Sequence, residues 1–138
     1  MTFLTAMVLS RVPSCGPPQP AAGTVTPGQL EAFSRLNDFR GPDLVPTAEL
    51  MVKAQEWSEH MASQGQISHS QLTSGIGPGW AVIGENVAVA TSLEIAQTAL
   101  ENSPGHRANM LDPRFSEGGV GVVWKNGNFW VTQDFVGR

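Results

Sequence analysis

The chain has 138 residues, of which 41% are hydrophobic, and this is enough for one domain with a sizeable core. Twelve Asp and Glu residues outnumber eight Lys and Arg residues, so the net charge is −4 and no basic surface for nucleic acid is expected. Only 14% of the residues are charged and no like-charge run occurs, which excludes a disordered charged tail.

Residues 1–15 resemble an export signal. Residues 2–10 form an apolar run that is too short to span a bilayer but has the length of a secretory signal core. The run leads to Val-Pro-Ser-Cys at 12–15, which resembles a bacterial lipobox, so Cys15 is a candidate lipid anchor. Cleaved secretion and a cytosolic thiol are the alternatives. Because Cys15 is the only cysteine, the chain can form neither an internal disulfide nor a cysteine-based zinc site.

Residues 16–27 are rich in Pro, Gly and Ala and show no apolar face, which predicts an extended tether before a folded domain at 28–138. The cap and first-turn proline at Thr26-Pro27 predict a helix that runs to Arg40. A second helix is predicted after Thr47, with one apolar stripe that ends at Gly65 and consists of Leu50, Ala54, Trp57 and Met61. His60 lies on this helix, and we interpret it as a histidine without a functional role.

The segment between Gly65 and Ser92 is rich in glycine and small polar residues, and long irregular segments in small domains are usually functional. It contains His69 and the Gly-Glu-Asn triplet at 84–86. We expect the triplet to form a loop between two short apolar runs that bury Glu85.

Ser92 is the expected cap of a third helix over 93–101, which leads directly into the sequence Ser-Pro-Gly-His-Arg at 103–107. Ser103 followed by proline is a helix-start signal, and we expect its hydroxyl to accept a free backbone N–H of the first turn. His106 then lies in that turn, where the positive end of the helix dipole favours a neutral imidazole.

The last segment is predicted to be a β-hairpin. Apolar runs at 119–124 and 129–136 flank an Asn-Gly pair at 126–127, the strongest short hairpin signal. Helices followed by a terminal antiparallel hairpin indicate the α+β class.

Six motifs in order over residues 28–136 together resemble a bacterial SCP-like member of the CAP superfamily (cysteine-rich secretory proteins, antigen five, pathogenesis-related proteins): LNDFR at 36–40, ISH at 67–69, GENVA at 84–88, SPGHRANML at 103–111, GVG at 119–121 and WVTQDF at 130–135. The resemblance implies an α-β-α sandwich, with helices on a small, mainly antiparallel sheet, and an extracellular or envelope-attached location. It also implies a cleft where His69, Glu85 and His106 converge. A second cleft carboxylate has no clear equivalent, because Glu94 and Glu101 are only nearby candidates on the third helix.

Two functions remain open at this stage. The first is an exported, monomeric binding module for a small hydrophobic ligand, a lipid, a peptide or an envelope component, which meets a membrane only through the N-terminal anchor. The second is a metal-dependent hydrolase in which His69 and His106 bind zinc or a similar divalent ion and Glu85 orients or deprotonates water. A buried hydrogen-bond network of these three residues without either function is the structural alternative. Serine catalysis has little support, since no G-x-S-x-G motif occurs.

Overall fold

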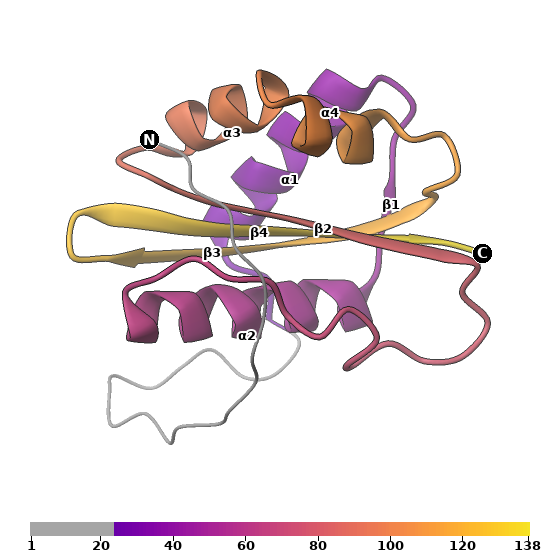
Figure 1. Ribbon diagram of the computed structural model, residues 1–138, viewed down its shortest axis with the longest axis horizontal. Coiled ribbons are helices and arrows are strands. Elements are labelled where there is room, and N and C mark those ends of the chain that lie inside the picture. The colour runs from indigo at the N-terminus through magenta and orange to yellow at the C-terminus, as the bar shows by residue number, and fades with distance from the viewer. Residues whose placement is uncertain (1–23) are drawn as a thin grey trace.

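The computed structural model describes residues 24–138 as three layers, with a four-stranded sheet between two layers of helices (Figure 1). The elements in chain order are α1 (Pro27–Arg40), β1 (Val45–Pro46), α2 (Ala48–Gln64), β2 (Val82–Ala90), α3 (Leu93–Glu101), α4 (Pro104–Leu111), β3 (Glu117–Lys125) and β4 (Asn128–Gly137). The predicted α+β class and the α-β-α sandwich are confirmed. The predicted export signal, Cys15 and most of the predicted tether lie outside the described residues.

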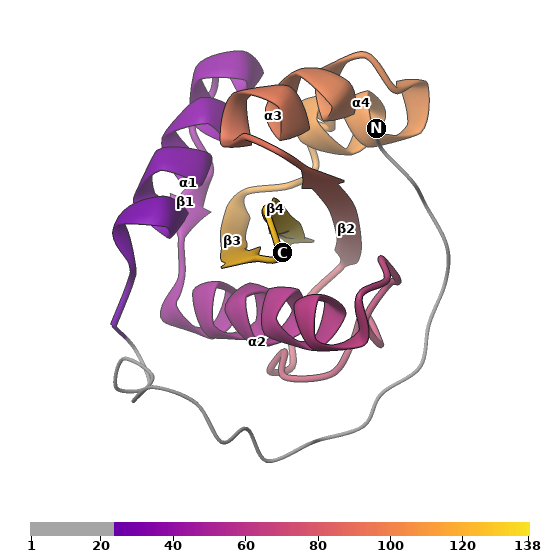
Figure 2. The ribbon, with the colours of Figure 1, turned by 90° about the vertical axis from the view of Figure 1, so that its left-hand side faces the viewer.

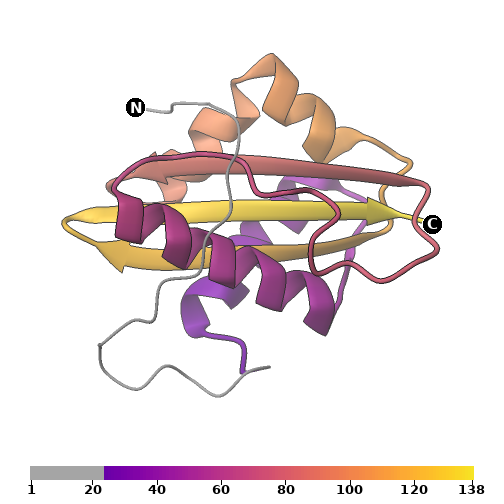
Figure 3. The ribbon, with the colours of Figure 1, turned by 60° about the horizontal axis from the view of Figure 1, so that its bottom comes forward.

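The two faces of the sheet are covered unequally. α2 and the segment that follows it lie on one face, whereas α1, α3 and α4 lie on the other (Figure 2). The strand order is β1-β3-β4-β2; β1 pairs with β3 in parallel and the other neighbours are antiparallel. β2 is therefore an edge strand, and the chain between α2 and β2 runs beside it (Figure 3).

Local capping explains where three helices begin. The side-chain hydroxyls of Thr26, Thr47 and Ser92 each accept a backbone N–H of the first turn that follows. α2 ends at Gly65, whose φ of 65° lies in the left-handed region that glycine adopts readily. The predicted starts of these helices and the end of α2 are confirmed.

The prediction of a loop at the Gly-Glu-Asn triplet is wrong, because residues 84–86 lie in the middle of β2. All nine residues of β2 have partners in β4, so cross-strand pairing extends the strand through the glycine. A side chain at this position would crowd the Phe115 ring, because a Cβ at Gly84 would lie 2.8 Å from it. Side chains alternate along a strand, so Glu85 faces α2 and Asn86 faces α4.

Two hydrophobic clusters fill the space between the layers. The larger one joins α1, α3 and α4 to the sheet, and the smaller one packs Trp57 and Met61 of α2 against Val87 and Trp130. The predicted hairpin is confirmed, with Asn126 and Gly127 at positive φ in the turn between β3 and β4. Among the helices within residues 24–138, none is long and apolar enough to cross a membrane.

Candidate functional site

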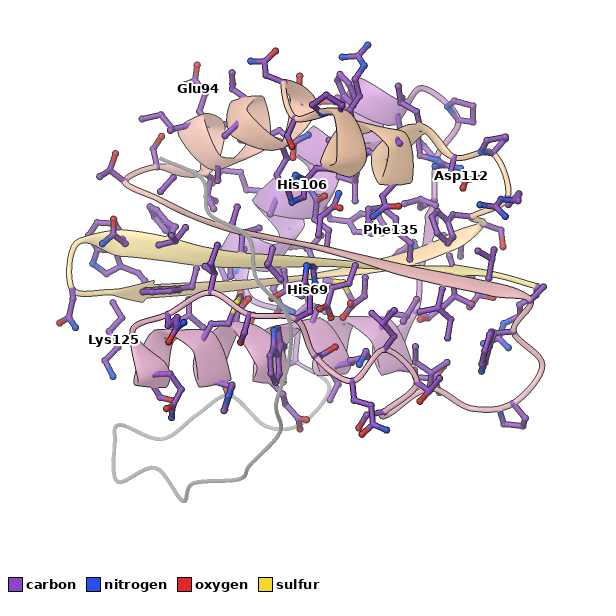
Figure 4. The ribbon with its side chains drawn as sticks, in the orientation of Figure 1. His69, Glu94, His106, Asp112, Lys125 and Phe135 are labelled. Carbon is purple, nitrogen blue, oxygen red and sulfur yellow. The ribbon has the colours of Figure 1, made fainter. Side chains whose placement is uncertain are left out.

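The two candidate histidines lie on opposite sides of the edge strand β2. His69 comes from the segment after α2, His106 comes from the first turn of α4, and β2 passes between them (Figure 4). Glu85 is the residue of β2 that reaches the His69 side. The segment after α2, the strand β2 and the helix α4 therefore bring together residues that are far apart in the sequence.

Glu85 is a buried carboxylate, and both of its oxygens accept hydrogen bonds. Its Oε1 accepts hydrogen bonds from the Ser70 backbone N–H at 2.8 Å and from His69 Nδ1 at 3.1 Å, and its Oε2 accepts the Ser70 hydroxyl at 2.5 Å. Burial alone would raise the pKa of Glu85. The hydrogen bonds from His69 and Ser70, together with the neighbouring Asp134, outweigh burial and hold the pKa of Glu85 below its ordinary value.

The ionised carboxylate fixes the protonation of the His69 ring. A carboxylate only accepts hydrogen bonds, so His69 Nδ1 must carry a proton in its bond to Glu85. In the neutral ring, Nε2 is then the nitrogen with a free electron pair. Histidines that bind metals usually donate their second ring N–H in this way, to a carboxylate or a carbonyl.

Lys53 is a charged neighbour that the sequence interpretation missed. It lies on α2 and is 8% exposed, and its Nζ donates to the Ser70 hydroxyl and to the Gln71 carbonyl, both at 3.0 Å. Because an ammonium group only donates, Ser70 accepts from Lys53 and passes its own proton toward Glu85. The sequence offered one indication of the burial of Lys53: it precedes Ala54, a residue of the apolar stripe of α2.

Asp134 is a second buried carboxyl group near Glu85, and it too was missed. The two residues are partners across β2 and β4, and Asp134 is 1% exposed. Burial and then the charge of Glu85 raise the pKa of Asp134 well above its ordinary value, so the carboxyl is protonated at neutral pH. An acidic residue inside an apolar strand was the signal for this site.

His106 has one engaged and one free ring nitrogen. Nδ1 lies 2.7 Å from the Ser103 hydroxyl, while Nε2 is buried and has no hydrogen-bond partner among residues 24–138. Burial, followed by the charge of His69, lowers the pKa of His106, which keeps the ring neutral. Both causes favour the neutral imidazole that the sequence predicts at this position.

Ser103 departs from its predicted role. It occupies the N-cap position of α4, but its hydroxyl makes no capping hydrogen bond and contacts the His106 ring instead. α4 is held from the sheet side, where Asn86 Nδ2 donates to the His106 carbonyl at 3.0 Å and Asn86 Oδ1 accepts from Asn109. The third residue of the triplet thereby fixes the position of the helix that carries His106.

The three predicted site residues are brought to one region but not into one hydrogen-bonded cluster. Glu85 contacts His69, whereas the Nδ1 partner of His106 is Ser103. No group of three His, Cys, Asp or Glu side chains within the described part of the chain is arranged to hold a metal ion. Glu94 is exposed on the outer surface of α3, and Asp134 takes the place beside Glu85 that neither Glu94 nor Glu101 fills (Figure 4).

Residues 35–135 match the family model described as the cysteine-rich secretory protein family, CAP. The chain belongs to the CAP family. The match covers the two histidines, both buried carboxyl groups and Ser103, so the resemblance inferred from the motifs is confirmed.

Comparisons with individual proteins agree with this assignment. The chain is 34% identical over 99 residues to the uncharacterized protein YkwD of Bacillus subtilis. The match covers 64% of this chain and 37% of that protein, so the chain spans little more than a third of this relative. An extracellular SCP-domain protein of Bacillus anthracis is 27% identical with a TM-score of 0.67, over 84% of this chain and 45% of that one. An outer surface protein of Borrelia burgdorferi, 17% identical with a TM-score of 0.64 over 79% of this chain and 90% of that one, shares the fold.

Proposed function

We propose that this CAP domain is an extracellular binding module in which His69 and His106 hold a divalent metal ion such as zinc through their Nε2 atoms. One observation carries the proposal: the Nε2 of His106 is buried, belongs to a neutral ring and has no partner among the described residues. A buried polar atom without a partner is rare and calls for an unseen ligand.

The residues present fit a metal ion. The hydrogen bond to Glu85 leaves the Nε2 electron pair of His69 available, and the same can hold for His106 through Ser103. Imidazole nitrogen is a ligand that zinc prefers, and the remaining positions would be filled by water or by an external ligand. A bound ion would act there as a Lewis acid toward that ligand.

Calorimetry with ZnCl₂ tests the proposal, and the chain supplies its own control histidine. We expect one saturable site per chain in the wild type, and loss of the measurable heat in both His69→Ala and His106→Ala. His60→Ala should bind as the wild type does, because His60 stacks on Trp57 and belongs to neither side of the site. Equal heats for His106→Ala and the wild type, or negligible heats in all four proteins, would contradict the proposal.

The engagement of Glu85 favours binding over the hydrolase alternative. A general base must lie within hydrogen-bond reach of the water whose proton it takes. Glu85 is 5% exposed, and three of its roughly four acceptor sites are taken by His69 and Ser70, which leaves little room for a substrate water. The hydrolase alternative would be supported if the wild type cleaved peptide substrates in a zinc-dependent manner and Glu85→Gln lost this activity while still binding the metal.

The lipid, peptide or envelope component that this module recognises is part of the same proposal. Support comes from the relatives, which are described as extracellular or outer surface proteins, and from two exposed apolar side chains, Leu72 and Trp80, on the segment that follows His69. Calorimetric titration with sterol-containing vesicles or fatty acids should give saturable binding. Trp124 lies exposed on the distant hairpin, so Trp124→Ala should retain binding while Trp80→Ala weakens it.

A further inference from the structure

The N-cap residues of the four helices in residues 24–138 all carry hydroxyl groups, and they behave differently. The hydroxyls of Thr26, Thr47 and Ser92 accept the backbone N–H three residues later, at 3.2, 3.2 and 3.0 Å. Ser103 is the fourth and accepts no such bond. The backbone N–H that it would take belongs to His106, and its hydroxyl lies on the ring of that same residue at 2.7 Å.

Ser103 therefore occupies the N-cap position of α4 but does not cap the helix, and its hydroxyl contacts the His106 ring instead. A capping hydrogen bond normally stabilises a helix, so Ser103 forgoes a stabilisation that a purely structural N-cap serine would provide. The hydroxyl lies instead against the ring whose other nitrogen is buried and unpartnered among the described residues. These two facts about one side-chain pair point to a role in the site.

The burial of Nε2 decides where the ring proton belongs. A neutral imidazole carries one proton, on either Nδ1 or Nε2. A proton on Nε2 would be a buried N–H without an acceptor among the described residues, and buried N–H groups without a partner are rare in proteins. A proton on Nδ1 can be donated to the Ser103 oxygen.

We propose that Ser103 is a positioning residue that accepts the Nδ1–H of His106, fixes the orientation of the ring and leaves Nε2 as its electron-pair donor. The proposal rests on the proposed function, because it names what orients one of the two metal-binding rings. Ser103 then does for His106 what Glu85 does for His69. Both rings present Nε2, one backed by a hydroxyl and the other by a carboxylate.

A nucleophilic role for Ser103 fits the contacts less well. In nucleophile–base pairs, a third group holds the second nitrogen of the base. Here that nitrogen is His106 Nε2, which has no partner in the described part of the chain. Ser103 therefore lacks the third member that a serine hydrolase would require.

Ser92→Ala is a matched control for Ser103→Ala, since each change removes the hydroxyl of an N-cap serine. Ser92→Ala should lower the melting temperature measurably, because that hydroxyl caps α3, and should leave the His106 ring resonances unchanged. Ser103→Ala should lower the melting temperature less. It should change the ¹⁵N resonances of the His106 ring toward a mixture of tautomers and weaken zinc binding about 10- to 100-fold. Ser103→Thr keeps the hydroxyl and should restore both readouts.

Four results would overturn the proposal. They are a wild-type His106 ring protonated on Nε2, unchanged ring resonances in Ser103→Ala, a fall in melting temperature as large as that of Ser92→Ala, and covalent labelling of Ser103 by a fluorophosphonate probe. The ring resonances are measured without metal, so they test Ser103 separately from the proposed function. A wild type that binds no zinc but shows the predicted tautomer and its loss in Ser103→Ala would refute the metal site and retain the positioning role.

Discussion

Three buried titratable side chains, Glu85, Asp134 and Lys53, lie near His69, and they differ in protonation state. Glu85 is ionised and accepts bonds from its neighbours, Asp134 is protonated, and the Lys53 ammonium lies close enough to oppose the negative charge. Like charges on paired strand residues repel, so only one carboxyl group of the pair ionises at neutral pH. This arrangement makes stability depend on pH in a specific direction.

Asp134→Asn should become more stable relative to the wild type as the pH rises. The folded wild type keeps the Asp134 proton, whereas the unfolded chain releases it near the ordinary value of 3.8. Above that pH the unfolded state therefore gains an ionisation that the folded state lacks, and the stability contributed by this group falls. Asparagine is neutral throughout and avoids the loss. Urea unfolding at pH 4.5 and pH 8 measures the difference, and an Asn variant whose relative stability is the same or lower at pH 8 would count against a protonated Asp134.

The sequence was sufficient to predict His69, Glu85 and His106 as site residues. It was not sufficient to predict Lys53 and Asp134, which influence the protonation of the site. The motifs are local and could be read directly, whereas Lys53 reaches Ser70 only after α2 packs on the sheet, and Asp134 meets Glu85 only through the register of β2 and β4. Ser103 could be recognised as an N-cap position, but the choice of its hydroxyl between the backbone N–H and the ring depends on the rotamer of His106.

At the scale of elements, β3 carries glycines where α2 crosses the sheet. A Cβ on Gly119 or Gly121 would overlap the α2 backbone at Leu50 and at Ala54 respectively. These glycines let the helix approach closely and set the distance between the α2 layer and the sheet. That distance in turn places Lys53 and the segment with His69 over Glu85.

Two glycine-to-alanine changes should therefore have opposite effects on the free energy of unfolding. Gly121→Ala should destabilise the fold by about 3 kcal/mol or more, because the obstructing atoms belong to the backbone and cannot rotate away. Gly105→Ala in α4 meets nothing within 4 Å and has no positive φ, so it should stabilise by about 0.4–1 kcal/mol. Urea unfolding of both variants checks this, and an equal loss in the two would mean that close packing of α2 on β3 does not determine the spacing.

The helices were predictable because their caps, stripes and stops are local signals, and the hairpin was predictable from its Asn-Gly turn. β2 was not, because its centre contains Gly84, Glu85 and Asn86, which are poor strand formers in isolation. Its continuity depends on pairing with β4 and on burial between two layers, which only the complete fold provides.

For the whole molecule, the candidate site joins the two helical layers across an edge strand. His69 belongs to the layer of α2 and His106 to the layer of α1, α3 and α4, and the two layers meet at the edge strand β2 (Figure 4). An ion held by both rings would connect the layers and stabilise the folded state in proportion to its affinity. The family match shows what kind of domain this is, while the proposed chemistry depends on these two rings.

The most direct test of that chemistry is the ¹⁵N spectrum of the three histidine rings, recorded before and after one equivalent of ZnCl₂. We expect the Nε2 resonances of His69 and His106 to shift together, their Nδ1 nitrogens to stay protonated, and His60 to remain unchanged. A spectrum in which neither Nε2 moves, or in which His60 responds and His106 does not, would contradict a metal site formed by His69 and His106.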